Sequence, residues 1–160
     1  MSHQPVNKSV EKVQSALKNY GLDIKIIEFS ASTRTAQEAA DQIGCNVAQI
    51  IKSLVFCTQE TNKPILILTS GVNRVNEKII EQLMGEKIKR ADADFVRQVT
   101  GFVIGGVPPL AHAEKMITFI DKDLLQYDCV WAAAGTPHTV FCINPADLAR
   151  ITNGTVTQVQ

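Results

Sequence analysis

The sequence predicts an α/β fold of the α+β type: a single domain with a curved mixed β-sheet or small barrel surrounded by helices. Capped amphipathic segments alternate with short β-rich runs along the chain. The runs 50–57 and 64–70 are joined by a short polar loop, which indicates a hairpin, whereas other runs are joined through helices. Hairpins mixed with helical connections favour a mixed sheet over a parallel one. The length of 160 residues is typical of one domain, expected over 1–160 with its core at about 8–153.

Five helices are expected from capping residues and apolar faces. Thr35 and Glu38 have the spacing of a capping box, in which the hydroxyl and the carboxylate satisfy backbone donors reciprocally. Asn46 and Gln49 repeat that spacing and predict one short helical turn. The predicted N-caps are Ser9, Thr35, Asn76, Asp92 and Asn144, and the glycines expected to end these helices are Gly21, Gly44, Gly85, Gly101 and Gly154.

The strands are predicted from runs of β-branched and aliphatic residues bounded by turn-forming residues. The run 86–91 is short and charged, which is typical of an edge strand. The predicted strands cover 23–29, 50–57, 64–70, 86–91, 102–106, 116–121, 129–134 and 139–143, with a further strand at the C-terminus.

The charge balance excludes one class of function. The chain has 16 Lys and Arg residues against 16 Asp and Glu residues, so its formal charge is zero. This argues against a protein that coats long nucleic acid or DNA by bulk electrostatics, but not against one that grips a short single-stranded end. Neither a membrane-spanning run nor a signal-peptide pattern is found, so a cytoplasmic protein without membrane contacts is expected.

No metal or cofactor is expected. The cysteines at 45, 57, 129 and 142 form no CxxC pair, and the three histidines complete no zinc-ligand spacing. Buried free thiols are the expected state of the cysteines.

Lys52 breaks the local pattern most clearly. It lies within the apolar run IIKSLVF, where strand alternation places it on the face of Leu54 and Phe56. A lysine there must extend to solvent, pair, or face a cavity. In a cavity its ammonium could hold an anion, a carbonyl or a ribose hydroxyl. An edge-strand lysine with a solvated head group is the alternative that periodicity alone favours slightly.

Two further segments depart from plain structural logic. In TGFVIGGVPPLAH (100–112), Gly105 and Gly106 would let the backbone approach a ligand and offer N–H donors to a developing oxyanion. In AAAGTPHTVF (132–141), the small residues leave space, and Thr136 and His138 add polar groups at a turn. A bulge and an ordinary hairpin are the alternatives, and a solvated loop residue is the alternative for His112.

Together these segments resemble the YbaK/EbsC family, the freestanding relatives of the editing domain inserted in bacterial prolyl-tRNA synthetase. The resemblance covers roughly residues 8–153. It depends on the order and spacing of TAQEAADQIG (35–44), IIKSLVF with Lys52, TGFVIGGVPP (100–109), FIDKDLL (119–125) and VWAAAGTP (130–137).

The resemblance implies a trans-editing aminoacyl-tRNA deacylase that binds the acceptor end of tRNA, on tRNA for proline or a related tRNA. An aminoacyl-tRNA synthetase is a second candidate partner. Lys52 matches the family's essential lysine. The loop at Gly105, Gly106, Val107 and Pro108 matches the wall of the amino-acid pocket, and Gly135 with Thr136 and His138 matches the opposite wall. His112 is a further candidate substrate contact, and Lys87, Lys89 and Arg90 are candidate contacts to tRNA phosphates.

The sequence also departs from the family pattern. Ala-Ala-Gly-Thr-Pro-His stands where cysteine-editing members carry Ser-Gly-Gly and a basic pair. A pocket for a small residue such as alanine, serine, threonine or cysteine is expected, with cysteine the least favoured. A non-catalytic module that senses aminoacyl-tRNA or docks on a synthetase is the alternative function. A small-molecule esterase would need a nucleophile and base, and no such pair is evident.

Overall fold

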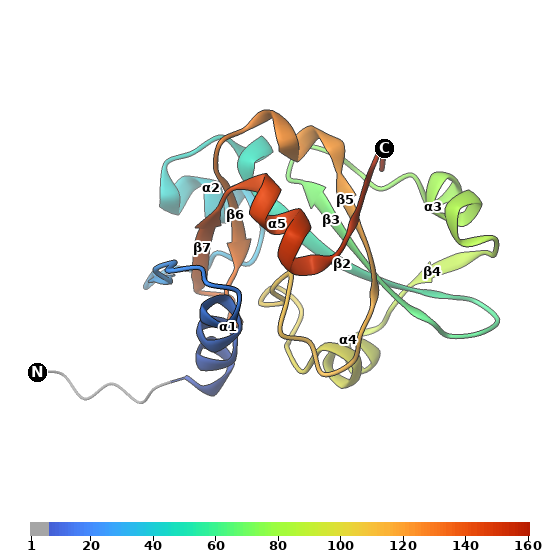
Figure 1. Cartoon of the computed structure of the whole chain (residues 1–160), viewed down its shortest axis with the longest axis horizontal. Helices are drawn as coiled ribbons and strands as arrows, with labels where there is room; N and C mark the ends of the chain where they lie inside the picture. Colours follow the sequence, from blue (N-terminus) through green and yellow to red (C-terminus); the bar gives the residue numbers. More distant parts are fainter. Residues whose placement is uncertain (1–6) are drawn as a thin grey trace, which may run out of the picture.

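A computed structural model describes residues 7–160 and shows a mixed α/β fold with two sheets (Figure 1). The N-terminal residues used above to exclude a signal peptide, with His3, lie outside the described residues. The strands are β1 (Ile27–Glu28), β2 (Ile51–Thr58), β3 (Pro64–Ser70), β4 (Ile88–Arg90), β5 (Ile117–Asp121), β6 (Val130–Ala133), β7 (Thr139–Ile143) and β8 (Thr155–Thr157). The helices are α1 (Lys8–Asn19), α2 (Ala36–Ile43), α3 (Glu77–Met84), α4 (Ala93–Thr100) and α5 (Pro145–Thr152), with the 3₁₀ turns η1 (Val47–Gln49) and η2 (Lys122–Gln126).

The larger sheet is built on the β2–β3 hairpin that the sequence predicted. Its strand order is β4-β2-β3-β5-β8. The β2–β3 and β2–β4 pairs are antiparallel, whereas β3–β5 and β5–β8 are parallel, so the sheet is mixed as expected. Figure 1 shows the hairpin crossing the molecule, with α3 and β4 at one end and the smaller sheet at the other.

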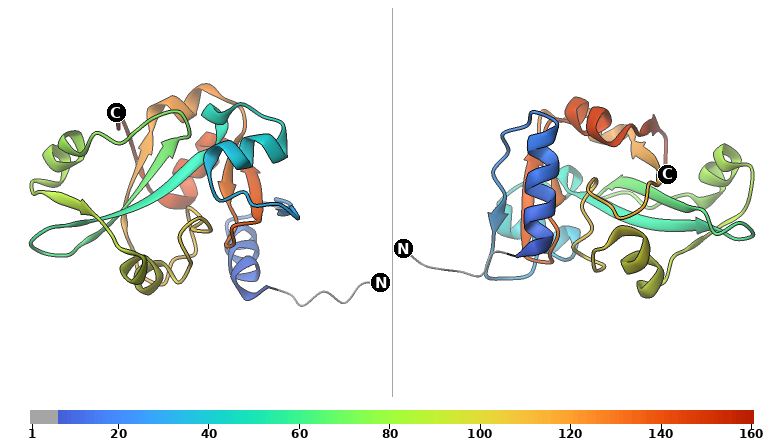
Figure 2. Two further views of the ribbon diagram at one scale, coloured as in Figure 1. Left: turned by 180° about the vertical axis from the view of Figure 1, so that it is seen from behind. Right: turned by 60° about the horizontal axis from the view of Figure 1, so that its bottom comes forward.

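The smaller sheet has the order β1-β7-β6 and is antiparallel. A parallel bridge between Ile50 and Trp131 joins it to the start of β2. Helix α1 stands beside this sheet (Figure 2), where Ser9 touches the turn at Gly135. The bridge holds β6 of the smaller sheet next to the start of β2 in the larger sheet.

Strand alternation separates the apolar residues of β2 into two clusters. Ile51 and Val55 pack into the main cluster between the sheets, whereas Phe56 belongs to a second cluster that Leu54 contacts. This is the alternation expected from the sequence. The second cluster also contains Val159, which is fully buried, so the chain beyond residue 153 contributes to the core.

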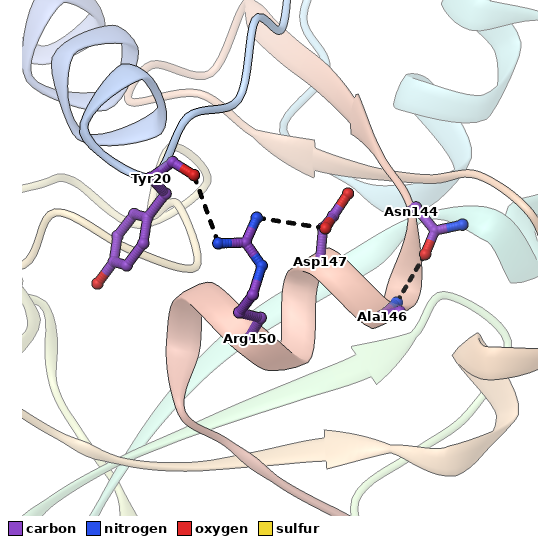
Figure 3. A network of polar contacts seen from close by, with 5 residues as sticks. All are labelled: Tyr20, Asn144, Ala146, Asp147 and Arg150. Carbon is purple, nitrogen blue, oxygen red and sulfur yellow. Dashed lines mark hydrogen bonds and ion pairs between the residues drawn. The ribbon is translucent and has the colours of Figure 1, made fainter.

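Arg150 joins the C-terminal helix to the N-terminal one (Figure 3). One guanidinium nitrogen donates to Tyr20 O at 3.4 Å, and the other lies 3.3 Å from Asp147 Oδ1. The same helix begins at Asn144, whose side chain accepts from the N–H of Ala146 at 2.8 Å. This confirms Asn144 as the predicted N-cap.

Three expected boundaries are wrong. Asn7 rather than Ser9 caps α1, because its side chain accepts from the N–H groups of Ser9 and Val10. Asn153 rather than Gly154 adopts the left-handed conformation that ends α5. The segment 102–106 forms no strand but a bend and a turn, because Gly105 adopts a positive φ that a strand does not allow.

The free thiols expected for all four cysteines are found only in part. Cys129, which directly precedes β6, and Cys142 on β7 are joined as a disulfide, with Cα atoms 6.0 Å apart. Cys45 and Cys57 are free, and Cys57 is buried. The spacing of Cys129 and Cys142 in the sequence did not predict this disulfide. The two residues come together only through the register of the β6–β7 pair, which the spacing does not reveal. Among residues 7–160, no helix has the length and apolar character needed to cross a bilayer.

Replacing Thr35 by Ala should lower the free energy of unfolding by about 1 kcal/mol, because the N-cap hydroxyl is lost. Thr35 Oγ1 accepts from the N–H of Glu38 at 3.1 Å, and the Glu38 carboxylate accepts from the N–H of Thr35 at 3.2 Å. Urea unfolding measures the difference. Thr35→Ser keeps the hydroxyl and serves as the control; equal losses in both variants would contradict the capping role.

Candidate functional site

A cavity of about 340 Å³ opens where the two sheets meet. Its walls come from the start of β2, strand β6, the start of α2 and the loop 104–107. Most of the lining is apolar. The lining residues are Thr33, Arg34, Thr35, Ala36, Ala39, Ile50, Ile51, Lys52, Ser53, Leu54, Ile104, Gly105, Val107, Trp131, Ala132, Ala133 and Val140.

One wall of the cavity is a strand edge that β4 does not cover. The N–H of Gly71 donates to Ile50 O, so antiparallel alternation directs the backbone groups of Ile51 and Ser53 away from β3. Strand β4 pairs only with Phe56–Thr58. The Ser53 hydroxyl is also buried and has no hydrogen-bond partner within residues 7–160. At Ser53 this edge therefore presents polar groups to whatever occupies the cavity.

Lys52 lines the cavity, and its side chain is half-buried. The ammonium donates to the backbone carbonyl of Asn73 in the loop after β3. Burial lowers the pKa of Lys52 from its ordinary value, and Arg74 and Arg90 lower that pKa further, whereas Asp121 raises it. The ammonium is not in bulk solvent, which was the alternative favoured by periodicity alone.

A buried carboxylate supports the carbonyl that holds Lys52. Asp121 is 1% exposed, and one of its oxygens accepts from Asn73 Nδ2 at 2.8 Å and from the N–H of Ser70 at 3.0 Å. Asp123 accepts from the same Asn73 amide at 2.8 Å. The Asn73 backbone is thereby fixed between Asp121 and the Lys52 ammonium.

The loop glycines do different things. Gly105 has φ +91° and lines the cavity, together with Val107. Gly106 does not line the cavity, and its N–H donates to Val103 O at 2.9 Å. The prediction that the Gly106 N–H is available to a developing oxyanion is therefore wrong. Within the described chain, the N–H groups of Gly105 and Val107 have no hydrogen-bond partner and remain available. Pro108 is buried behind this wall.

The expected opposite wall is displaced by a few residues. Gly135 packs against Ser9, and Thr136 packs against Gly106, so neither lines the cavity. A Cβ added to Gly106 would lie 2.9 Å from Thr136 Cα, which shows that the turn touches the loop from behind. His138 is exposed and its Nδ1 lies 3.2 Å from Ala31 O. Ala132, Ala133 and Val140 form the wall instead.

The remaining candidates lie outside the cavity. His112 lines a separate hollow with α1, where burial lowers its pKa although a hydrogen bond to Pro108 O opposes this. Lys89 and Arg90 line another hollow beside Phe95, and Lys87 precedes β4. None of these three cations lines the cavity with Lys52, although the charge of Arg90 lowers the pKa of Lys52. Strand β4 pairs with the end of β2 that is farther from the smaller sheet (Figure 1).

Sequence reasoning missed four residues near the cavity. Trp131 and Val140 belong to recognised strands, but only the meeting of the two sheets assigns them to a wall. Asn73 belongs to none of the motifs, and Asp121 lies in the segment FIDKDLL (119–125) but was given no role in the site; its side chain caps η2. The position of Lys52 within an apolar strand was a signal that its ammonium needed a polar partner.

The cavity has no set of metal ligands. Its lining includes neither carboxylate, histidine nor cysteine, and residues 7–160 contain no cluster of three such side chains. The available chemistry consists of one half-buried ammonium, one arginine, three hydroxyl-bearing residues (Thr33, Thr35 and Ser53) and backbone donors.

Comparison with known proteins places this geometry in a family. The model of the aminoacyl-tRNA editing domain matches residues 30–151, which is most of the chain. The chain belongs to the aminoacyl-tRNA editing domain family. The matched segment contains Lys52, the loop 104–107 and both strands of the opposite wall.

Relatives of this editing domain occur alone and within synthetases. An uncharacterized Bacillus subtilis (strain 168) protein, YwhH, is 28% identical over 88% of this chain and 89% of its own length. The proline--tRNA ligase of Limosilactobacillus fermentum is 30% identical over 56% of this chain, which corresponds to 16% of that enzyme. A crystal structure described as a candidate trans-editing enzyme for prolyl tRNA synthetase superposes with a TM-score of 0.91 and 41% identity, covering 98% of this chain and 99% of that one.

Asp121→Asn should lower the pKa of Lys52 further, because the carboxylate charge is what raises it. The ammonium would then lose its proton at a lower pH than in the wild-type protein. NMR titration of the lysine side chain measures the pKa. Asp94→Asn on exposed α4 is the control and should leave the Lys52 titration in place; equal effects of both substitutions would contradict a local interaction.

Proposed function

We propose that this editing domain hydrolyses the ester between an amino acid and the terminal ribose of a mischarged tRNA. The observation that carries the proposal is one cavity with an ammonium, Lys52, and free backbone donors at Gly105 and Val107. An ester substrate needs such groups at its carbonyl and at its ribose. The family membership and the relation to proline--tRNA ligases support tRNA for proline as the substrate.

The proposed reaction uses water as the nucleophile. The water oxygen bonds to the carbonyl carbon and loses a proton, while the π electrons of the carbonyl group move onto the carbonyl oxygen. Collapse of this oxyanion breaks the bond between the acyl carbon and the ribose oxygen, which takes up a proton. The products are a free amino acid and a tRNA with an intact terminal ribose.

The N–H groups of Gly105 and Val107 are suited to the oxyanion, because backbone donors fixed in a loop need no reorganisation as charge develops. One of the three N–H donors of the Lys52 ammonium is hydrogen-bonded to Asn73 O, which leaves two for the substrate. Its charge favours the developing oxyanion or a ribose oxygen. The lining contains no basic side chain other than Lys52 and Arg34, so the proton of the attacking water passes to solvent or to a ribose hydroxyl.

The walls favour a small apolar amino acid. Ala39 and Ala132 are almost fully buried, and Ala133 and Val140 complete this part of the lining. Thr136, which was expected to pair a substrate hydroxyl, is not in the wall. We therefore place alanine first among the candidate side chains, ahead of serine, threonine and cysteine.

Lys52→Ala should lower the rate of deacylation of alanyl-tRNA for proline by about 100-fold or more, the loss typical of removing one stabilising donor. Single-turnover assays measure the rate, and circular dichroism checks the fold. Lys63→Ala, at the exposed end of the hairpin, is the matched control and should retain wild-type rates. A Lys52→Ala protein with wild-type rates would overturn the catalytic role of Lys52, whereas a wild-type protein that binds the charged tRNA without deacylating it would favour the binding module.

The amino-acid preference is tested separately. Wild-type protein should deacylate alanyl-tRNA faster than seryl-, threonyl- and cysteinyl-tRNA carrying the same tRNA body, because the walls at Ala39, Ala132, Ala133 and Val140 offer a side-chain hydroxyl no partner. The ratio of kcat/KM between these substrates is the measurement. Equal values across the four substrates would refute a size-selective pocket.

A further inference from the structure

The charged residues of the cavity lining are both cations. Lys52 and Arg34 are in the lining, and no Asp or Glu accompanies them. Lys52 belongs to β2, whereas Arg34 immediately precedes the N-cap of α2. Two positive groups around an otherwise apolar hollow favour an anionic ligand. The aminoacyl ester and its ribose carry no negative charge and would engage one of the two cations through its N–H donors, which leaves the other to be explained.

Arg34 lies across the glycine loop. A Cβ added to Gly105 would lie 2.5 Å from Arg34 Cγ, 3.2 Å from Cδ and 3.3 Å from Nε. The stem of the arginine therefore runs directly over the Gly105 backbone, and only glycine permits this approach. The side chain connects the start of α2 to the loop 104–107 and delivers its guanidinium to the rim of the cavity.

The guanidinium has no protein partner to occupy it. Within residues 7–160 the single ion pair is Arg150 with Asp147, and the only hydrogen bond of Arg34 is made by its backbone N–H to Ser32 Oγ at 3.1 Å. The nearby Glu38 carboxylate accepts from the backbone of Thr35. The residue is exposed, so its charge is hydrated at no burial cost and its five N–H donors remain available.

A phosphate matches these properties best. The planar guanidinium fork pairs with two oxygens of a phosphate at once, which gives both energy and orientation. If the ester lies at Lys52 and the loop donors, the terminal ribose extends toward the rim, and the next group along the chain is a phosphodiester. We propose that Arg34 binds the phosphodiester that joins the last two nucleotides of the charged tRNA. This inference rests on the proposed function.

The test compares two substrates that differ in that phosphate. Alanyl-tRNA contains it, whereas alanyl-adenosine, an alanine ester of the free nucleoside, does not. In Arg34→Ala, the ratio of kcat/KM for alanyl-tRNA to that for alanyl-adenosine should fall about tenfold, mainly through KM. The slope of log kcat/KM against log salt should decrease by about 1 for the tRNA substrate. Arg34→Lys should restore part of the ratio, and Arg97→Ala on α4 is the control.

An unchanged ratio and salt slope in Arg34→Ala would overturn the proposal. An equal loss on both substrates would do so as well, because it would mean that Arg34 merely supports the Gly105 loop. Binding of the uncharged dinucleotide CpA against adenosine, followed by NMR, separates this proposal from the proposed function. A CpA preference lost in Arg34→Ala supports phosphate binding even if the wild-type protein hydrolyses neither ester, and a preference kept in that variant overturns it.

Discussion

Placing the Lys52 ammonium beside the apolar residues of β2 removes it partly from water, and burial lowers its pKa. The structure offsets this cost by a chain of contacts: the ammonium donates to Asn73 O, and the Asn73 amide donates to the buried Asp121 carboxylate. Asp121 sits at the end of β5, and Asn73 follows β3, its parallel neighbour. The parallel pairing of these strands thus decides where the lysine is held, and it places Asp121 where its charge opposes the lowering of the Lys52 pKa.

The second constraint is the incomplete pairing of β2. A fully paired strand would leave no polar edge, and a fully open one would invite association with another chain. Here β4 covers one end and the bridge to Trp131 closes the other, so only the stretch at Ile51–Leu54 borders the cavity. The loop 104–107 forms another part of the lining, and the N–H groups of its Gly105 and Val107 have no hydrogen-bond partner within residues 7–160. Polar groups from two separate segments therefore border one largely apolar cavity.

The sequence predicted what local chemistry determines. The capping box at Thr35 and the β2–β3 hairpin follow from spacing and alternation, and both are found. Lys52 was recognisable because an ammonium in an apolar run is costly wherever it lies. The opposite wall was misplaced because Gly135 and Thr136 look permissive in sequence but pack against α1 and Gly106. The pairing of Cys129 with Cys142 depends on a register that no local pattern encodes.

A formally neutral chain can bind a polyanion if its few useful cations are left without acidic partners. Lys87, Lys89 and Arg90 form the densest basic run, yet they lie on β4 or just before it, away from the cavity. Lys52 and Arg34 are isolated in sequence but share one lining without a carboxylate. Because charge interactions beyond about 8 Å are screened at physiological salt, local placement matters more than the total. The arrangement suits a protein that binds one short end of a nucleic acid and makes few contacts with the rest of it.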